Sequence, residues 1–372
     1  MKLIVFSSAP IVKINDRLFM YSPYEKEMEI WAKHSDEIQF CCPVWNEDRG
    51  LLLSQIQFST LENIILSEFN VKNFKSAFYS VKVILKNIII IFKAMQQADH
   101  IHLRCPGNIG LLACVVQILF PSKTKTAKYA GNWDPKSKQP LSYCLQKWIL
   151  SNTFLTKKMK VLVYGKWPNS SPNILPFFTA SYSENEEKTA IKSVKPNGEI
   201  RMLFVGTLVG GKNPLYAVQL LEQLRHNNLN IHLDIFGEGP QRSLLQDYIE
   251  MQKLSDCVFL HGNQNQQVLK KAYRESHFVV LASKSEGWPK AIAEGMFWGC
   301  VPLATAVSCV SYMLDYGNRG VLLQMDLKHD SDVVYELIRQ AVIFEEKSKA
   351  AMEWSRKYTI EYFGTEIKKL LR

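Results

Sequence analysis

Short runs of β-branched and other apolar residues alternate with longer helical patterns along this chain of 372 residues. In the first half the runs lie at residues 2–6, 39–42, 100–103, 126–130 and 161–164. In the second half they lie at residues 200–205, 232–236, 258–260 and 278–282. Helical patterns at residues 214–225 and 242–253 separate them. Strands that alternate with helices in this way predict an α/β fold with parallel sheets.

A change of texture near the middle of the chain divides it in two. Residues 167–198 are rich in Pro, Asn and Ser, which predicts a linker. The length also favours two domains. We therefore expect one Rossmann-like domain over residues 1–180, completed by a C-terminal helix at about 355–372, and a second over residues 181–354. Two doubly wound domains predict a ligand site in a cleft between them, beyond the carboxyl ends of their strands.

The net charge of +10 lies entirely in the first half. Residues 1–180 contain 22 Lys and Arg against 12 Asp and Glu, whereas residues 181–372 contain 23 of each. This division predicts an anionic partner for the first domain, such as a membrane surface, a nucleic acid or a phosphorylated substrate. Solvated, lysine-rich helices are the alternative explanation.

A helical pattern over residues 71–97 carries much of this charge. Its lysines fall on one side of the predicted helix, at positions Lys72, Lys75, Lys82, Lys86 and Lys93. Its apolar residues, which include Val81 and Leu85, are predicted to form the opposite side. Such a basic amphipathic helix either lies on an anionic membrane or packs on the sheet with a solvated face. The longest apolar stretch, residues 109–120, is too short to span a bilayer.

The spacing of the cysteines is not typical of a metal site or of a disulfide framework. The eight cysteines include no C-x-x-C pair, and several lie in apolar runs. We expect reduced core thiols and no metal site.

The densest polar motif follows the predicted strand at residues 278–282. It contains Glu286, Gly287, Trp288, Pro289, Lys290 and Glu294. Pro289 suits the first turn of a helix, whose free amides can bind anionic oxygens. The two carboxylates can accept hydrogen bonds from the vicinal hydroxyls of a sugar. Alternatively, both are surface acids that the helix dipole favours at a helix start.

Two glycine-rich loops precede this motif. The first contains Gly206, Thr207, Gly210, Gly211, Lys212 and Asn213. In it the glycines permit close approach of a ligand, Lys212 can bind a diphosphate, and Asn213 can cap the helix that begins at Pro214. The second contains Gly237 and Gly239, which permit a tight turn.

The three motifs together, in this order over residues 201–324, resemble the donor-binding domain of retaining glycosyltransferases of family 4. These enzymes have the GT-B fold, two facing Rossmann-like domains with a donor cleft between them. The resemblance implies that Glu294 binds the nucleotide ribose. It implies that Glu286 and the amides of residues 287–290 hold the transferred sugar and its phosphate, and that Lys212 neutralises the departing diphosphate. It adds Gly206, Thr207, Gly211, Gly237, Gly287, Trp288, Pro289 and Lys290 to the donor-binding set, and implies no metal or other cofactor.

The chain departs from the family at two places. Thr207 stands where the family usually has an arginine, and we hypothesise that Lys290 supplies the missing charge. In the first half, the family's usual histidine is absent, and its glycine-rich loop after the first strand is replaced by residues 7–10. We assign Arg104, Asn132 and Ser8 to the acceptor side.

These inferences predict a retaining glycosyltransferase that moves a sugar from a nucleotide-sugar donor to an acceptor hydroxyl. The expected acceptor is a lipid-linked sugar in bacterial cell-surface polysaccharide synthesis, such as capsule, O-antigen or exopolysaccharide. The expected location is the cytoplasm or the inner face of the cell membrane. Two alternatives remain, a nucleotide-sugar epimerase of the same fold and a non-enzymatic polyanion-binding protein. Nucleic acid is not the expected partner, because no recognition motif is present.

Overall fold

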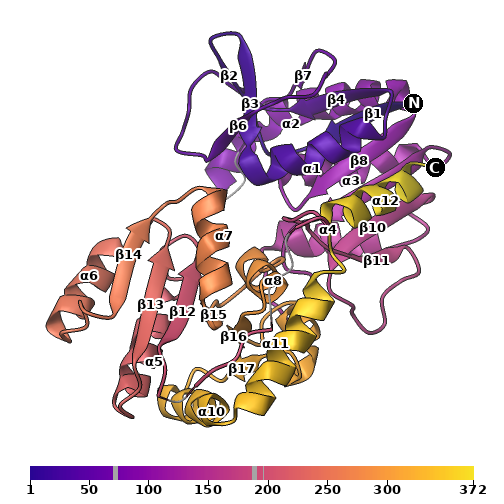
Figure 1. Ribbon diagram of the computed structural model, residues 1–372. Coiled ribbons are helices and arrows are strands. Elements are labelled where there is room, and N and C mark those ends of the chain that lie inside the picture. The colour runs from indigo at the N-terminus through magenta and orange to yellow at the C-terminus, as the bar shows by residue number, and fades with distance from the viewer. Residues whose placement is uncertain (70–73, 187–190, 196) are drawn as a thin grey trace. The chain divides into compact units, whose positions relative to one another are not determined.

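The computed structural model describes residues 1–69, 74–186, 191–195 and 197–372. The chain forms two compact units (Figure 1). Unit 1 comprises Met1–Thr179 and Glu361–Arg372, and unit 2 comprises Ala180–Ile360. Each unit contains one large parallel sheet with helices packed against it, so the predicted α/β class is confirmed.

Unit 1 is built on a seven-stranded sheet. Its strands, in spatial order, are β11 (Ile174–Phe177), β10 (Met159–Tyr164), β9 (Thr124–Tyr129), β8 (His100–Cys105), β1 (Lys2–Phe6), β4 (Glu37–Cys42) and β7 (Ile64–Ile65). Neighbouring strands all run parallel. The strand order reverses between β1 and β8, and a ligand site is expected outside the carboxyl ends of strands at such a point.

Five helices belong to this sheet: α1 (Ser22–Lys33), α2 (Phe74–Gln97), α3 (Asn108–Val116), α4 (Leu141–Ser151) and α12 (Ile360–Leu371). Helix α3 packs against both α2 and α4, so the three form one layer. A short 3₁₀ turn, η1 (Gln117–Leu119), continues α3. Helix α12 packs beside α1, because a Cβ atom added at Gly364 would lie 3.4 Å from His34 Nε2.

A second, four-stranded sheet follows β1 and was not predicted. It contains, in spatial order, β5 (Val44–Trp45), β2 (Ile11–Ile14), β3 (Arg17–Tyr21) and β6 (Leu53–Gln55). The β2–β3 hairpin turns through Asn15 and Asp16, both at positive φ. Asn and Asp tolerate this backbone conformation better than most residues, which explains the turn at this position.

One detail of the sequence interpretation of unit 1 is wrong. Residues 174–177 fall inside the predicted linker but form strand β11, which pairs with β10. Val81 and Leu85, on the predicted apolar side of the helix, are 47% and 56% exposed. Of the α2 lysines, Lys72 lies outside the described residues.

Unit 2 is built on a six-stranded parallel sheet. Its strands, in spatial order, are β14 (Val258–Gly262), β13 (Ile231–Phe236), β12 (Ile200–Val205), β15 (Phe278–Leu281), β16 (Val301–Thr305) and β17 (Val321–Leu323). Its helices are α5 (Pro214–Arg225), α6 (Arg242–Met251), α7 (Gln266–Glu275), α8 (Lys290–Phe297), α9 (Val310–Met313), α10 (Leu327–Arg339) and α11 (Ala341–Ser355), with a 3₁₀ turn η2 (Asp315–Gly317). The strand order reverses between β12 and β15.

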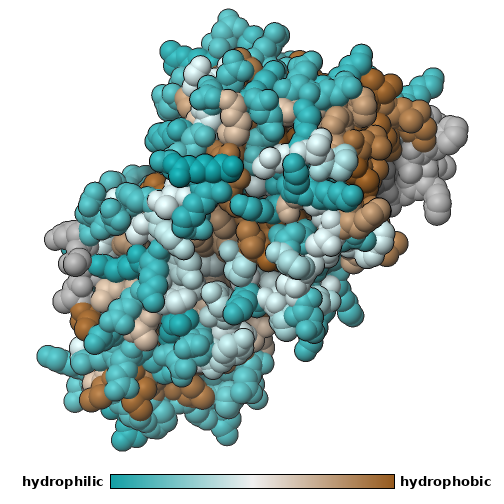
Figure 2. Space-filling view, turned by 90° about the vertical axis from the view of Figure 1, so that its right-hand side faces the viewer, coloured by the Kyte–Doolittle hydropathy of each residue, from teal (hydrophilic) through white to brown (hydrophobic). Residues whose placement is uncertain are grey.

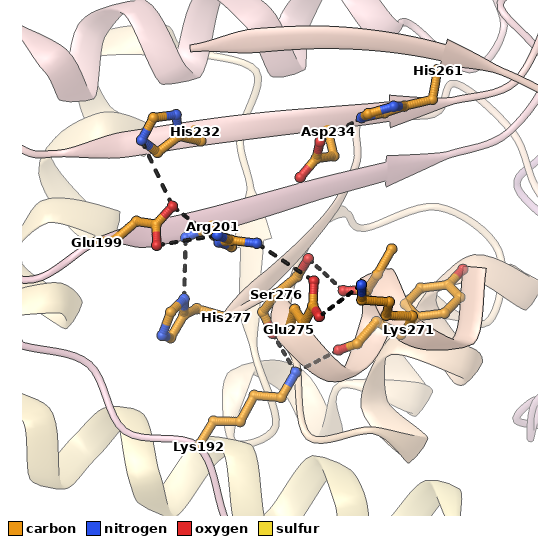
Figure 3. A network of polar contacts seen from close by, with 12 residues as sticks. Lys192, Glu199, Arg201, His232, Asp234, His261, Lys271, Glu275, Ser276 and His277 are labelled. Atoms are coloured by element: carbon orange, nitrogen blue, oxygen red, sulfur yellow. Dashed lines mark hydrogen bonds and ion pairs between the residues drawn. The ribbon is translucent and has the colours of Figure 1, made fainter. Parts of the chain in front are cut away.

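Polar contacts tie together the amino ends of the unit 2 strands (Figure 3). The backbone N–H of Arg201, in β12, donates to His277 Nδ1 at 3.1 Å, and its guanidinium binds Glu199 at 3.0 Å. Lys192 Nζ donates to the carbonyl oxygen of Tyr273 at 2.6 Å near the end of α7. The contacts of Arg201, His277 and Lys192 lie at the opposite edge of the sheet from the carboxyl ends, so the candidate ligand site is elsewhere.

Unit 2 begins and ends at neighbouring positions. The Ile360 N–H donates to the Tyr182 carbonyl oxygen at 3.0 Å. The buried Tyr182 ring packs against Phe297 and Trp298, with centroids 4.9 and 5.2 Å away. Both places where the chain enters and leaves unit 2 are therefore fixed to its core.

Candidate functional site

The three predicted donor motifs all lie at the carboxyl ends of the unit 2 strands. The loop after β12 contains Gly206 and Lys212, the loop after β13 contains Gly237, and the loop after β15 contains Glu286. The first and third loops flank the point where the strand order reverses. The Lys284 N–H donates to the Gly211 carbonyl at 2.8 Å and joins these two loops. Lys212 and Glu286, which are 74 residues apart in sequence, thus belong to one surface.

An ion pair occupies this point of the sheet. Lys212 Nζ lies 2.6 Å from Glu286 Oε1. The Glu286 side chain is 5% exposed, whereas Lys212 is 31% exposed. A partly accessible cation therefore stands beside a buried carboxylate, and the two predicted catalytic residues are in direct contact.

Backbone packing explains the glycines of the second loop. Gly237 has a φ of +144°, and a Cβ atom added there would lie 1.9 Å from the Gly206 carbonyl oxygen. The Gly206 N–H donates to the Phe236 carbonyl, and the Leu208 N–H to the Glu238 carbonyl, both at 2.9 Å. The absence of a side chain at Gly237 thus allows the two loops to pack closely and form these hydrogen bonds. In contrast, a Cβ atom added at Gly211 would meet nothing within 4 Å, so this glycine leaves open space beside Lys212.

Asn213 does not cap helix α5 with its side chain, contrary to prediction. It occupies the N-cap position but has a left-handed backbone, with φ 50° and ψ 56°, and its side chain makes no capping hydrogen bond. A capping side chain requires an extended backbone at this position, which explains the difference. Thr207, the residue in place of the family's arginine, is exposed in the same loop.

The residues before α8 have mixed surroundings. The Trp288 side chain is 8% exposed and packs against Trp354 and Tyr358, with centroids 6.0 and 5.8 Å away. Pro289 is buried and is the N-cap of α8. The Gly287 carbonyl accepts a hydrogen bond from Ser308 Oγ at 3.3 Å. The loop is therefore fixed by its apolar side chains, and its backbone N–H groups are the parts that suit a ligand.

Lys290 and Glu294 form a second ion pair, one turn apart on α8. Lys290 Nζ lies 3.6 Å from Glu294 Oε1, with Lys290 41% and Glu294 13% exposed. The buried Tyr273 hydroxyl lies near the same carboxylate: its pKa is raised by burial and then by the charge of Glu294. The charge of Lys290 is thus directed at Glu294 rather than at Glu286.

One buried polar group near this site was not predicted. Ser283, directly before the Glu286 loop, is 1% exposed, and its hydroxyl has no hydrogen-bond partner among the described residues. A lone serine between a strand and a loop gives no sequence signal, so only the structure could reveal it.

In unit 1, the predicted acceptor-side residues lie at the carboxyl ends of β1, β8 and β9. Ser8 Oγ accepts a hydrogen bond from the Ile109 N–H at 3.2 Å, at the start of α3. Asn132 Oδ1 accepts from the Asp134 N–H at 2.9 Å. His102, in contrast, is a buried core residue whose ring lies 2.8 Å from Thr126 Oγ1 and 4.2 Å from the Trp31 ring.

Arg104 belongs to a buried charge cluster that was not predicted. Arg104 Nη1 and Lys128 Nζ lie 2.9 and 3.1 Å from the same oxygen of Glu27. One carboxylate thus serves two cations, and Arg104 remains 20% exposed. The excess positive charge, at the carboxyl end of β8, suits an anionic group on a ligand.

This cluster makes the stability of the fold depend on pH in the acidic range. Burial alone would raise the pKa of Glu27, but the charges of Arg104 and Lys128 outweigh it and hold the pKa at about 2. A folded-state pKa below the unfolded value of 4.5 contributes stability above pH 4.5 that is lost as the pH falls toward 2. We expect Glu27→Gln to lower the free energy of unfolding most at neutral pH, and progressively less in acid. Denaturant titrations of both proteins from pH 7 to 3 would measure this; a constant difference would contradict it.

The described residues contain no group of three or more His, Cys, Asp and Glu side chains that could hold a metal ion.

Comparison with known proteins gives the fold and the domain class. Residues 185–357 match the family of glycosyl transferases group 1. Protein CapJ of Staphylococcus aureus is 22% identical over 325 residues, which cover 82% of this chain and 78% of CapJ. Some matching structures are longer, and this chain spans 58–60% of their length.

Several solved structures match over the whole chain, and two of them illustrate the likeness. The lipopolysaccharide outer core galactosyltransferase WaaB, in its apo form, has a TM-score of 0.69 at 14% identity and covers 100% of this chain and 99% of WaaB. Anabaena HepE, in complex with UDP and glucose, has a TM-score of 0.68 at 12% identity and covers 100% and 98%. These likenesses confirm the predicted GT-B fold.

Proposed function

We propose that this chain is a glycosyltransferase that moves a sugar from a nucleotide-sugar donor to an acceptor hydroxyl with retention of configuration. The match of residues 185–357 to glycosyl transferases group 1 and the GT-B fold support the proposal. The observation that carries the proposal is the Lys212–Glu286 pair at the point where the unit 2 sheet reverses its strand order. Both members come from loops where doubly wound sheets bind nucleotides.

The chemistry of transfer explains why a cation is needed there. The bond between the anomeric carbon and the diphosphate oxygen breaks, and that oxygen gains negative charge. A fixed cation stabilises this charge more strongly in a site that excludes water. Lys212 is the more exposed member of its pair, so its amine can contact a diphosphate while remaining beside Glu286. The proposal requires no metal.

We assign roles to the remaining donor-binding residues from their positions. Glu286 and the N–H groups of residues 287–290 would hold the transferred sugar and its phosphate. Glu294 would accept hydrogen bonds from the ribose hydroxyls. Gly206 and Gly211 would leave space for the diphosphate, whereas Gly237 would shape the loop through its contact with Gly206.

We propose that the acceptor binds to unit 1 and is a lipid-linked sugar used in cell-surface polysaccharide synthesis. The partly exposed Arg104, in a cluster with one carboxylate and two cations, supports an acceptor that carries phosphate. Such an acceptor would place the protein at the cytoplasmic face of a membrane. WaaB, a lipopolysaccharide galactosyltransferase with the same fold, supports this assignment.

The test is a donor screen with UDP-, GDP- and ADP-sugars, with and without EDTA, in which the released nucleotide is measured. We expect slow hydrolysis of one class of donor, unchanged by EDTA, and an acceptor product with the donor's anomeric configuration by NMR. Conversion of the donor to an epimeric sugar without any acceptor would identify an epimerase instead. Binding of DNA without binding of any sugar nucleotide would remove the enzyme proposal.

Lys290→Ala tests the hypothesis that this lysine replaces the arginine absent at Thr207. We expect donor turnover to fall about tenfold, less than for Lys212, because an exposed cation such as Lys290 stabilises the charge on the diphosphate less than a partly buried one. Lys284→Ala is the matched control, because Lys284 is an exposed lysine in the same loop region. Equal turnover in Lys290→Ala and the parent protein would show that the second charge comes from elsewhere.

A further inference from the structure

Helix α2 displays apolar side chains on its outer side. Val81, Leu85 and Ile89 are 47%, 56% and 57% exposed. Their spacing of four residues places them in one row along the helix. The helix packs on the sheet through other residues, among them the buried Ile91, Ala94 and Met95. The three side chains of this row therefore do not form part of the core of unit 1.

Helix α4 displays a second row of the same kind. Leu141, Leu145 and Trp148 are 87%, 44% and 60% exposed, at spacings of four and three residues. Phe154, just beyond the helix, is 75% exposed. Helix α3 lies between α2 and α4, so both rows lie on the outer side of one helix layer. Figure 2 shows apolar side chains gathered on unit 1 at the upper right of the view. We call these two rows and Phe154 the outer apolar surface.

The sequence around this surface is strongly basic. Residues 70–179 contain sixteen Lys and Arg residues but only two acidic ones, Asp99 and Asp134. Lys82 and Lys86 are exposed beside the α2 row. Lys157 and Lys158 are exposed just after Phe154. Exposed apolar groups are thus combined with positive charge and almost no negative charge.

The inner side of α4 contacts the predicted acceptor region. Gln146 Oε1 accepts a hydrogen bond from the Gly107 N–H at 3.3 Å, beside Ser8 and the start of α3. Lys147 Nζ donates to the Trp133 carbonyl at 2.9 Å, next to Asn132. One short helix therefore connects the outer apolar surface to the loops at the carboxyl ends of β8 and β9.

We propose that the outer apolar surface docks on an anionic lipid bilayer, and that α4 thereby holds the acceptor loops at the membrane; the second clause rests on the proposed function. Trp and Phe partition to the bilayer interface, and lysines extend to its anionic headgroups. Each lysine near such a surface contributes about fivefold to the partition coefficient. The exposed lysines of this surface and the scarcity of acidic residues around it favour an anionic bilayer over a protein partner. No helix among the described residues is long and apolar enough to cross a bilayer, so attachment would be peripheral.

Sedimentation with vesicles tests the proposal. The vesicles contain equal parts of phosphatidylglycerol and phosphatidylcholine, and pure phosphatidylcholine vesicles are the comparison. We expect the parent protein to pellet with the anionic vesicles, and less at high salt. The variant Leu141→Ser/Trp148→Ser/Phe154→Ser should lose at least tenfold in partition coefficient. The variant Lys82→Gln/Lys86→Gln/Lys157→Gln/Lys158→Gln should lose more than tenfold at low salt, and tests the charge independently if the serine variant does not fold.

The matched control is Leu244→Ser/Met251→Ser/Val342→Ser, which removes exposed apolar residues from unit 2 and should pellet like the parent. Donor hydrolysis without vesicles should be equal in all variants, so it tests the proposed function separately. Equal pelleting of the parent and the serine variant would overturn the proposal. The proposal would also be overturned if the parent protein did not pellet with anionic vesicles but formed a dimer in sedimentation velocity, and if the serine variant did not form that dimer. The surface would then be an interface between copies of this chain.

Discussion

Lys212→Met lowers the rate of sugar transfer by about 10²–10³-fold, the range found when one preorganised group that stabilises transition-state charge is removed. Methionine preserves most of the length and apolar part of the side chain and removes only the cation. The effect should fall mainly on kcat, because charge on the diphosphate oxygen grows as the bond breaks. Steady-state kinetics with the donor identified in the screen would measure both constants.

A structural explanation of the same loss must be excluded, because Glu286 would lose the partner that lies 2.6 Å away. A buried carboxylate without its cation destabilises a protein. We therefore expect Lys212→Met/Glu286→Gln to regain thermal stability but not activity. Lys284→Met, which changes an exposed lysine nearby, should retain both. Recovery of transfer in the double variant would show that neither charge takes part in transfer, and that Lys212→Met acts only by leaving the buried carboxylate unpaired.

Gly237→Ala destabilises unit 2 by about 3 kcal/mol or more. A Cβ atom at this position would lie 1.9 Å from the Gly206 carbonyl oxygen, and the φ of +144° is unfavourable for any residue other than glycine. The neighbouring atom is backbone, so no side chain can move to relieve the overlap. Denaturant unfolding followed by tryptophan fluorescence would measure the loss, with separate transitions fitted if the two units unfold independently.

Gly211→Ala is the matched control for this substitution. An added Cβ atom meets nothing within 4 Å, and we expect the free energy of unfolding to change by less than about 0.5 kcal/mol. If the diphosphate approaches this backbone, the same variant should bind the donor nucleotide more weakly, although it is stable. Equal stability of Gly237→Ala and Gly211→Ala would mean that the two loops are not packed as described.

The sequence predicted the central sheets well because strands in parallel sheets are buried on both faces and appear as continuous apolar runs. Strand β12 and helix α5 have the predicted limits, since a buried run and a proline mark their ends. The small sheet of β2, β3, β5 and β6 was missed because its strands are short and two of its pairings, β2 with β5 and β3 with β6, join segments that are far apart in sequence. The β2–β3 hairpin is local, and its turn at Asn15 and Asp16 was overlooked. Strand β11 was missed because Pro176 and its neighbours resemble a linker.

The candidate site shows the same limit. Sequence motifs placed Lys212 and Glu286 in loops that follow predicted strands, but their contact depends on the order of strands in space. The Glu27 cluster was missed because Glu27, Arg104 and Lys128 come from three different elements. Ion pairs between distant segments leave no periodic pattern, so only the folded structure could show them.

The hydrogen bond between Ile360 and Tyr182 has a consequence for the evolution of this architecture. Because the chain enters and leaves unit 2 at adjacent points, unit 2 is topologically an insertion within unit 1. A segment whose ends already meet can be excised, expressed alone or exchanged for a homologous segment without stretching its host. Recombination at residues 180 and 360 would therefore exchange unit 2 and leave unit 1 unchanged, and chimaeras joined at these residues would test the proposal that unit 2 selects the donor.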